Sequence, residues 1–310
     1  MSIARPHDLG PAAWERDAPL ATCSGYRTGG TARWLASPAS VEEFQEVVRF
    51  CRDEGVPRLV LGGGTNTLIA DGRYAGVIVS TQRWTGIEDL GGGRLKVRAG
   101  SSLRGLIGRA VHLGYAGLQG LIGIPGTVGG AIWGNAGGAS RAGSSLATEE
   151  RWISRWVESL TVLDEQGRES SLRGAELPWG YRFSGLGPRI VLEAILALEP
   201  GGDAGALKRE TRRLYLRKEE TQPLRAASAG CVFRNPPGES AGRLIERAGL
   251  KGSRIGGALV SERHANFIVN DRGATSTDIE ALIERVRRVV RREHGIELER
   301  EIIVTGGGRG

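Results

Sequence analysis

Glycine is the residue that most constrains this chain, supplying 49 of its 310 residues, well above the usual share of about 7%. The glycines concentrate in GGGTN at 62–66 and in GLQGLIGIPGTVGGAIWGNAGG at 117–138. A residue without a Cβ atom adopts positive φ angles easily and lets a ligand approach the backbone. Such backbone forms either tight turns between strands or a concave array of N–H groups that binds an anion such as a pyrophosphate. Two long runs in the same half favour phosphate binding.

The glycine spacing excludes two common nucleotide-binding folds. Neither run matches G-x-G-x-x-G before a helix or G-x-x-x-x-G-K-[ST], so the Rossmann and P-loop motifs are absent. Short apolar strands are predicted at 58–61, 76–81, 95–100, 159–167 and from Ile190 to 200. Short strands with glycine-rich turns and few helices predict an α+β arrangement in the first half.

Helical periodicity marks the rest of the chain. Residues 40–54 begin with a capping box of Ser40 and Glu43 and place Cys51 on the apolar stripe. A second helix is predicted from Leu103 to Leu113, before Gly114. We predict a domain boundary in the glycine-rich stretch 201–206, dividing the chain into domains 1–205 and 206–310.

The second domain begins with a charged helix at 207–220. A helix near 240–249 and a strand pair around 256–270 follow. The last helix is predicted to begin at Thr277, with Glu280 completing its capping box, and to end at Gly295. The final segment, IELEREIIVTG, is predicted to be a strand.

The net charge of +7 comes almost entirely from arginine. Arginine pairs with both carboxylates and phosphates, so nucleic acids and small anionic metabolites are both possible partners. The densest basic run, RVRRVVRREH at 285–294, has helical spacing, and aromatic residues make up only 5% of the chain. The run is therefore interpreted as a solvated helix face rather than a nucleic-acid-binding patch.

Three widely spaced cysteines, Cys23, Cys51 and Cys231, form no CxxC pair. This pattern argues against a disulfide framework and a structural zinc site. No apolar stretch approaches 18 residues, and the start MSIARPHDLG lacks the apolar core of a signal peptide. We expect a soluble cytoplasmic protein without membrane insertion, in which Cys23 and Cys51 pack in the core.

Cys231 has a different setting, the stretch SAGCVFRNP at 228–236. Its thiol could pack in the core, bind a metal, act as a redox partner or donate a proton. The residues alone leave these roles open.

Eight motifs in order give the chain a family resemblance. They are RTGGTARWL (27–35), LGGGTNTLIAD (61–71), GIPGTVGGAIWGNAGG (123–138), GYRFS (180–184), TQPL with SAGCVFRNP (221–236), AGRLIERAGLKG (241–252), VSERHANFIVN (260–270) and LEREI (298–302). In this order they resemble the UDP-N-acetylenolpyruvoylglucosamine reductases, flavoenzymes that make UDP-N-acetylmuramate for peptidoglycan. The resemblance implies an FAD-binding domain of the vanillyl-alcohol-oxidase/p-cresol-methylhydroxylase type in two subdomains, followed by an α+β substrate-binding domain.

The resemblance also names a cofactor and the residues that bind it. It implies noncovalent FAD, because the early loop offers neither a histidine nor a cysteine for attachment, and NADPH as co-substrate. The implied FAD-binding residues are Gly62, Gly63, Gly64, Thr65, Asn66, Ile124, Pro125, Gly126, Thr127, Gly129, Gly130 and Asn135.

The implied reaction transfers a hydride from reduced FAD N5 to the vinyl carbon of the enolpyruvyl ether, while C2 takes a proton. Negative charge builds on the enolate, so the site needs a cation and an acid. By resemblance, Arg182 stabilises the enolate, Glu301 binds the carboxylate as a protonated or proton-sharing acid, and Cys231 donates the proton. Without the resemblance, Arg182 would be interpreted as a surface residue after a turn and Glu301 as part of a solvated strand.

Cys231 departs from the family, which usually carries serine at this position. A thiol is similar in size and, ionising near pH 8.5, is the stronger acid. The substrate, UDP-N-acetylglucosamine enolpyruvate, is expected to contact Arg234, Asn235 and Lys251. His264 and Asn266 are motif positions without an assigned role.

Two further departures concern the connections. Residues 139–158 form a longer connection than the family usually has, interpreted as an extra surface helix or else as a lid or an oligomer contact. Only the five residues GLGPR (185–189) separate GYRFS from the strand predicted to begin at Ile190. Longer members of the family carry here a tyrosine-bearing loop that covers the substrate. The chain lacks this loop and therefore resembles the shorter type II form.

Two alternative functions remain. An oxidase or dehydrogenase with the same FAD domain would share the glycine-rich loops but would not require Arg182, Cys231 and Glu301 together. An RNA-binding module would be colourless and strongly salt-dependent.

Overall fold

The computed structural model describes residues 13–137 and 152–306. These residues belong to two compact units that alternate along the chain. The first unit contains residues 13–15, 34–63, 76–137 and 152–216, and the second contains 16–33, 64–75 and 217–306.

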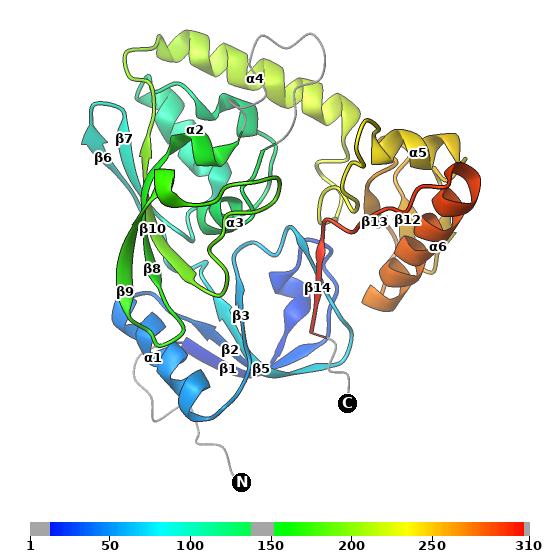
Figure 1. The fold of residues 1–310 in the computed structure, drawn as a ribbon, viewed down its shortest axis with the longest axis horizontal. Helices are drawn as coiled ribbons and strands as arrows, with labels where there is room; N and C mark the ends of the chain where they lie inside the picture. Colours follow the sequence, from blue (N-terminus) through cyan, green and yellow to red (C-terminus); the bar gives the residue numbers. More distant parts are fainter. Residues whose placement is uncertain (1–12, 138–151, 307–310) are drawn as a thin grey trace. The chain divides into compact units, whose positions relative to one another are not determined.

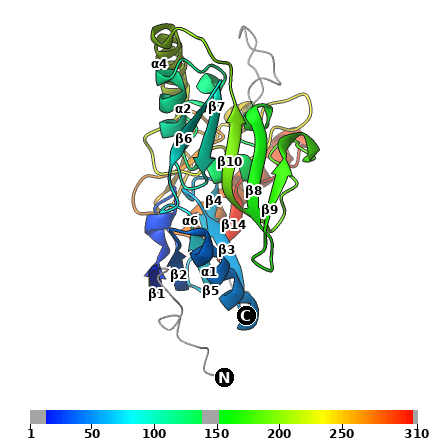
Figure 2. The same ribbon diagram turned by 90° about the vertical axis from the view of Figure 1, so that its left-hand side faces the viewer.

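A five-stranded antiparallel sheet dominates the first unit (Figures 1 and 2). Its order is β6-β7-β10-β8-β9, with β10 paired to β7 on one side and to β8 on the other. The helices α2 and α3 pack together, and α3 also contacts β10 and β7. The strands are β6 (Ile87–Gly91), β7 (Arg94–Arg98), β8 (Val157–Leu163), β9 (Glu169–Arg173) and β10 (Ile190–Ala197), and the helices are α2 (Leu103–His112) and α3 (Val128–Trp133).

A four-stranded sheet precedes it in the chain, in the order β1-β2-β5-β3. The strand β3 (Arg58–Leu61) runs parallel to β5 (Arg73–Ser80), so Leu61 pairs with Ser80 where β3 enters the first glycine run. The other elements of this region are β1 (Ala13–Pro19), a 3-10 helix (Leu20–Cys23), β2 (Thr31–Ser37) and α1 (Val41–Asp53).

A single apolar core holds the first unit together. The ring of Phe44 on α1, fully buried, lies edge to face with that of Trp84 at 6.3 Å. The inward-facing side chains of β7 and β10 and the apolar faces of α1, α2 and α3 join this core. Burying so many apolar side chains is the main force that holds the sheet in place.

The second unit has its own core around α6 (Ser276–His294). The apolar stripe of α6 packs on a three-stranded antiparallel sheet and on α5 (Ala241–Arg247) (Figure 1). Tyr26 and Leu68 from the early part of the chain are buried in this core. The strands are β11 (Arg254–Ile255), β12 (Ala258–Val260) and β13 (Ile268–Asn270), and β14 (Ile303–Thr305) pairs in parallel with β4 (Thr67–Ile69).

Several sequence predictions are confirmed. The helix α1 begins after Ser40, whose side chain accepts from the N–H of Glu43 at 3.2 Å. Gly114 follows α2 with a φ of 74°, and Gly295 ends α6 with a φ of 68°. Cys23 and Cys51 are buried.

Other boundaries differ from the predictions. The N-cap of α6 is Thr275, with Asp278 completing the capping box, so the predicted pair of Thr277 and Glu280 is wrong. The stretch predicted as a linker already contains the first residues of α4 (Ala204–Thr221). Of the predicted final strand, only Ile303–Thr305 forms β14.

Candidate functional site

The two glycine-rich runs meet in the first unit. Gly62 directly follows β3, and a Cβ atom at this position would lie 2.2 Å from Thr127 Oγ1. Thr127 is the N-cap of α3, and its side chain accepts from the N–H of Gly130. The helix α3 was not predicted from the sequence, because a run so rich in glycine has low helix propensity. Only glycine at position 62 allows this approach.

The backbone of the first glycine run offers hydrogen-bond donors. Among the described residues, no group accepts from the N–H of Gly62, Gly63 or Gly64. Gly64 has a φ of 61° and Gly126, in the second run, a φ of 110°, values that only glycine adopts without strain. Consecutive backbone donors of this kind suit the diphosphate of a dinucleotide. The residues present therefore fit the diphosphate part of FAD.

The end of the first glycine run is fixed within the second unit. A Cβ atom on Gly64 would lie 1.9 Å from the carbonyl oxygen of Cys23. The carbonyl of Asn66 accepts from the N–H of Ile303 at 3.0 Å, next to the parallel pairing of β14 with β4. The loop that carries Thr65 and Asn66 is thus tied to the segment that follows Glu301.

Arg182 lies in a strained turn of the first unit. Its φ is 53°, a region that costs a non-glycine residue of the order of 1–3 kcal/mol. Gly180 and Phe183 on either side exchange backbone hydrogen bonds at 2.9 and 3.2 Å and close the turn. The Nη1 atom of Arg182 donates to the carbonyl of Gly137 at 3.0 Å. This contact joins the GYRFS turn to the end of the second glycine run.

Asn135 is tied to the same turn. It is buried, with a φ of 41°, and its Nδ2 donates to the carbonyl of Gly180 at 2.9 Å. Its Oδ1 accepts from the N–H of Ser154 at 3.3 Å. The structure thus brings Asn135 and Arg182, two predicted site residues, into one cluster.

Cys231 and Glu301 come together in the second unit. The N–H of Glu301 donates to the carbonyl of Val232 at 2.8 Å, one residue beyond Cys231. The N–H of Arg234 donates to the carbonyl of Glu299 at 2.9 Å, so the two segments run antiparallel. This backbone pairing places the thiol motif directly beside the carboxylate motif.

Asn266 fixes the thiol segment from the other side. Its buried amide accepts from the N–H of Phe233 at 2.9 Å and donates to the carbonyl of Phe233 at 2.8 Å. The carbonyl of Asn266 also accepts from the N–H of Val232. No role was assigned to Asn266 from the sequence. In the structure it holds the backbone just after Cys231.

The predicted substrate-binding residues have local partners as well. The Oδ1 of Asn235 accepts from the N–H of Ala241 at 3.1 Å, at the start of α5. Lys251 forms an ion pair with Glu246 at 2.6 Å. Arg234, Asn235 and Lys251 all belong to the second unit.

Tyr26 is a residue near the thiol that the sequence analysis missed. Its hydroxyl is completely buried and has no hydrogen-bond partner of good geometry among the described residues. Burial raises the pKa of Tyr26 above its usual range, the nearby Cys231 adds to the rise, and the backbone of Ala229 opposes it. The hydroxyl therefore stays protonated. Its only sequence signal was a tyrosine directly before the RTGG motif.

The predicted catalytic residues fall into two groups by unit. Arg182 belongs to the first unit, whereas Cys231 and Glu301 belong to the second. Their joint action on one substrate stays a prediction.

The connection 139–158 is only partly described. Residues up to 151 lie outside the described residues, and Ile153–Trp156 form a 3-10 helix before β8.

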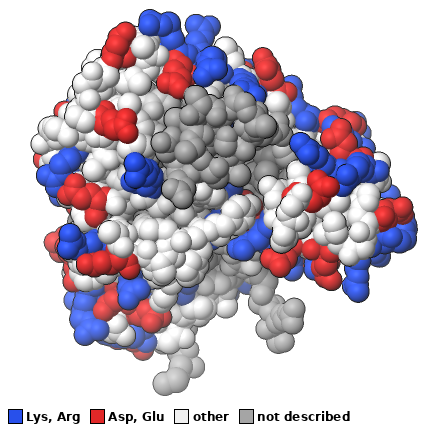
Figure 3. Space-filling view, turned by 45° about the horizontal axis from the view of Figure 1, so that its top comes forward, with Lys and Arg blue, Asp and Glu red and all other residues white. Residues whose placement is uncertain are grey.

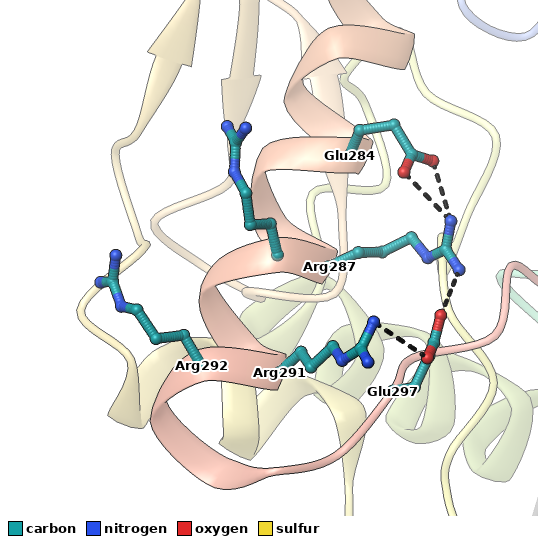
Figure 4. A pocket seen from close by; sticks show the side chains of 6 residues that line it. Glu284, Arg287, Arg291, Arg292 and Glu297 are labelled. Atoms are coloured by element: carbon teal, nitrogen blue, oxygen red, sulfur yellow. Dashed lines mark hydrogen bonds and ion pairs between the residues drawn. The ribbon is translucent and has the colours of Figure 1, made fainter.

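Two arginines on the basic face of α6 form ion pairs with neighbouring glutamates (Figure 4). Arg287 donates to Glu284 and Glu297, each at 3.0 Å, and Arg291 lies 3.7 Å from Glu297. These side chains line a hollow of about 480 Å³ that includes none of the predicted site residues. The ion pairs favour the interpretation of a solvated helix face. Basic and acidic side chains are also interspersed over the face of the molecule visible in Figure 3.

No helix in residues 13–137 or 152–306 is both long and apolar enough to cross a bilayer. Within the same ranges, no three His, Cys, Asp or Glu side chains are grouped as metal ligands.

Comparisons with known proteins agree with the predicted fold. Residues 32–172 match the profile described as "FAD binding domain", and residues 222–305 match the C-terminal domain of UDP-N-acetylenolpyruvoylglucosamine reductase. The α+β class and the order of the two domain types are thereby confirmed.

Full-length relatives carry the same reductase name. The chain is 40% identical over 290 residues to one from a Synechococcus species, covering 93% of this chain and 90% of the relative. It is also 40% identical to one from Heliobacterium modesticaldum, covering 96% of this chain and 92% of the relative. The crystal structure of the reductase from Thermus caldophilus superimposes with a TM-score of 0.79 at 33% identity, covering 95% of this chain and 99% of that one.

Proposed function

This chain belongs to the family of UDP-N-acetylenolpyruvoylglucosamine reductases, and from that premise we propose that it reduces UDP-N-acetylglucosamine enolpyruvate to UDP-N-acetylmuramate. NADPH supplies the electrons, and the product enters peptidoglycan synthesis. The observation that carries the proposal is the backbone pairing of the segments that hold Cys231 and Glu301, in a chain that also matches an FAD-binding domain.

The glycine-rich loops are the proposed FAD-binding residues. The N–H groups of Gly62 to Gly64 would bind the pyrophosphate, and the 124–130 segment, whose Thr127 contacts Gly62, would complete the binding site. When bound, FAD supplies hydride transfer between NADPH and the vinyl carbon of the substrate. The proposed division is an FAD-binding domain at 1–205 and a substrate-binding domain at 206–310.

Arg182 stabilises the developing enolate. Hydride addition to a vinyl carbon conjugated with a carboxylate leaves negative charge on the carboxylate oxygens and C2. A guanidinium forms two parallel hydrogen bonds with a carboxylate, which fixes both orientation and charge. The strained turn between Gly180 and Phe183 presents this side chain and restricts its orientation.

Cys231 delivers the proton to C2. The pairing of Val232 with Glu301 and the hydrogen bonds of Asn266 to Phe233 fix the backbone around the thiol. A general acid must be held within hydrogen-bond reach of the atom that it protonates, and a rigid backbone meets this requirement. Glu301, carrying or sharing a proton, donates to the substrate carboxylate.

The nucleotide part of the substrate binds to the second unit. Arg234 pairs with a phosphate oxygen, and Asn235 and Lys251 contact the uridine diphosphate. The ion pair of Lys251 with Glu246 is exposed enough to rearrange when a diphosphate binds, because such surface pairs contribute little.

Flavin spectroscopy of the purified protein tests the proposal. We expect flavin absorbance that NADPH bleaches anaerobically and that the enolpyruvyl nucleotide restores. Formation of UDP-N-acetylmuramate, followed by mass spectrometry, identifies the product.

The same experiment separates the alternative functions. An oxidase acting on another substrate would recover its colour with oxygen but not with the enolpyruvyl nucleotide. A colourless protein that cannot take up FAD would contradict the proposal entirely.

A further inference from the structure

Trp152 contacts the turn that carries Arg182. Its ring lies edge to face with that of Tyr181, with centroids 5.6 Å apart. The guanidinium carbon of Arg182 lies 5.9 Å from the Trp152 ring centroid and 5.6 Å from that of Tyr181. Tyr181 belongs to the turn of Arg182 itself, whereas Trp152 comes from a separate segment.

Hydrogen bonds to the backbone fix both segments that form this contact. The side chain of Asn135 bridges the carbonyl of Gly180 and the N–H of Ser154, so the Trp152 segment and the Arg182 turn are tied to the same buried residue. Arg182 also donates to Gly137. All of these residues belong to the first unit, so the cluster is defined within one compact body.

We propose that Trp152 is a positioning residue that holds the Arg182 guanidinium in its working orientation. This inference rests on the proposed function, in which Arg182 meets the substrate carboxylate. Arginine has many rotamers, and the entropy lost on ordering it opposes every contact that it makes. A ring that attracts the cation reduces this loss before the substrate arrives.

The proposal concerns a feature of this particular chain. Trp152 lies within the 139–158 connection that the sequence analysis singled out as unusually long. The described end of this connection contributes a side chain to the Arg182 cluster, rather than only linking α3 to β8.

Kinetics of the two half-reactions test the role. In Trp152→Leu, reduction of the flavin by NADPH should proceed within about twofold of the wild-type rate, because the role proposed for Arg182, stabilising the enolate, belongs to the other half-reaction. Reoxidation by the enolpyruvyl nucleotide should slow about tenfold, which corresponds to ~1.4 kcal/mol, with the loss in kcat rather than in KM. Trp152→Phe should restore most of the rate because it keeps a ring.

A second readout is independent of turnover. In the flavin-loaded protein, the Nε–Hε resonance of Arg182, identified by its absence in Arg182→Lys, should be displaced by the ring current of Trp152. The displacement should collapse in Trp152→Leu and persist in part in Trp152→Phe. Arg155→Ala is the matched control, because Arg155 lies in the same segment but faces the ring of Trp156.

The two readouts separate failure of this inference from failure of the proposed function. If wild-type protein is not reoxidised by the enolpyruvyl nucleotide, the function is wrong, and the resonance still decides whether Trp152 orders Arg182. An unchanged Arg182 resonance in Trp152→Leu overturns the inference, as does an equal loss in both half-reactions. If Trp152→Leu does not fold, Trp152→Gln removes the ring with a polar side chain suited to the half-exposed position and decides the outcome.

Discussion

Backbone strain at single residues coincides with the candidate site. Only four non-glycine residues in the described part of the chain have a positive φ, and Asn135 and Arg182 are two of them. Such conformations persist when the surrounding structure enforces them, and they occur often at functional sites. The hydrogen bond from Asn135 to Gly180 links the two strained residues. Glycine marks positive φ in a sequence, but nothing in the sequence marked Asn135 or Arg182 as strained, so this part of the site required the structure.

The first prediction concerns stability and distinguishes the contribution of the Asn135 backbone conformation from that of its side-chain amide. Asn135→Gly tolerates the φ of 41° but loses both side-chain hydrogen bonds, whereas Asn135→Ala loses the bonds and adds strain. We expect both variants to be destabilised, and Ala to be worse than Gly by about 1 kcal/mol. Denaturant unfolding measures the difference. Equal stability of the two variants would show that the left-handed backbone costs little here.

The second prediction concerns the thiol. Cys231→Ser should keep turnover, with a shifted acid limb in its pH profile, because a hydroxyl can also donate the proton. Cys231→Ala should still allow NADPH to bleach the flavin but should block product formation. Stopped-flow absorbance and product analysis distinguish the two steps. Wild-type turnover in the Ala variant would remove Cys231 from the mechanism.

At the scale of elements, α6 depends on a residue far away in sequence. The carboxylate of Asp71 accepts from the N–H groups of Ser276 and Thr277 at 3.1 and 3.0 Å, and the Ser276 hydroxyl accepts from the Asp71 N–H. Burial alone would raise the pKa of Asp71, but the hydrogen bonds from Thr277 and Ser276 outweigh it and lower the pKa. The start of α6 is thus capped from the first glycine-rich motif.

The third prediction follows from this cap. Asp71→Ala should lower the free energy of unfolding at pH 7 by about 1 kcal/mol, a modest value because the carboxylate is partly exposed. The folded-state pKa lies below the unfolded value of about 3.9. The extra free energy of unfolding of the wild type over Asp71→Ala is therefore present above that pH. It disappears as the pH falls through the folded-state pKa.

Urea unfolding at pH 7 and at pH 3 measures this change. Asp53→Ala is a matched control, because Asp53 is exposed, pairs with the neighbouring Arg52 and caps no helix. An Asp71→Ala deficit that stays constant down to pH 3 would show that the charge contributes nothing.

The elements also show the limits of sequence reasoning. Periodicity with capping signals located α1 and α2, because both depend on neighbouring residues. The start of α6 was misplaced by two residues because Thr275–Asp278 and Thr277–Glu280 fit the same capping pattern. The helix α3 and the strand β4 were missed because tertiary contacts stabilise them. The pairing of the Cys231 and Glu301 segments joins residues far apart in the chain. The family motifs identified these two residues, but residue spacing could not predict that their segments pair.

At the scale of the whole molecule, the fourth prediction concerns the flavin. Acid precipitation should release FAD into the supernatant, because the first glycine run offers no histidine or cysteine for attachment. Removing FAD should lower the thermal midpoint, and adding FAD should restore it, because a ligand that binds only the folded state stabilises that state. Colour that remains in the acid pellet would show covalent attachment.

The alternation of the two units along the chain has a consequence for synthesis on the ribosome. The first unit is complete once residue 216 has emerged, whereas the segments 16–33 and 64–75 belong to a unit whose remaining residues are translated last. Tyr26 and Leu68 are buried in the core of the second unit in the folded protein. During most of translation the residues that cover them have not yet been synthesised. Nascent chains stalled before α6 should therefore hold a protease-resistant first unit with these early segments open to cleavage, a window in which a chaperone could engage them.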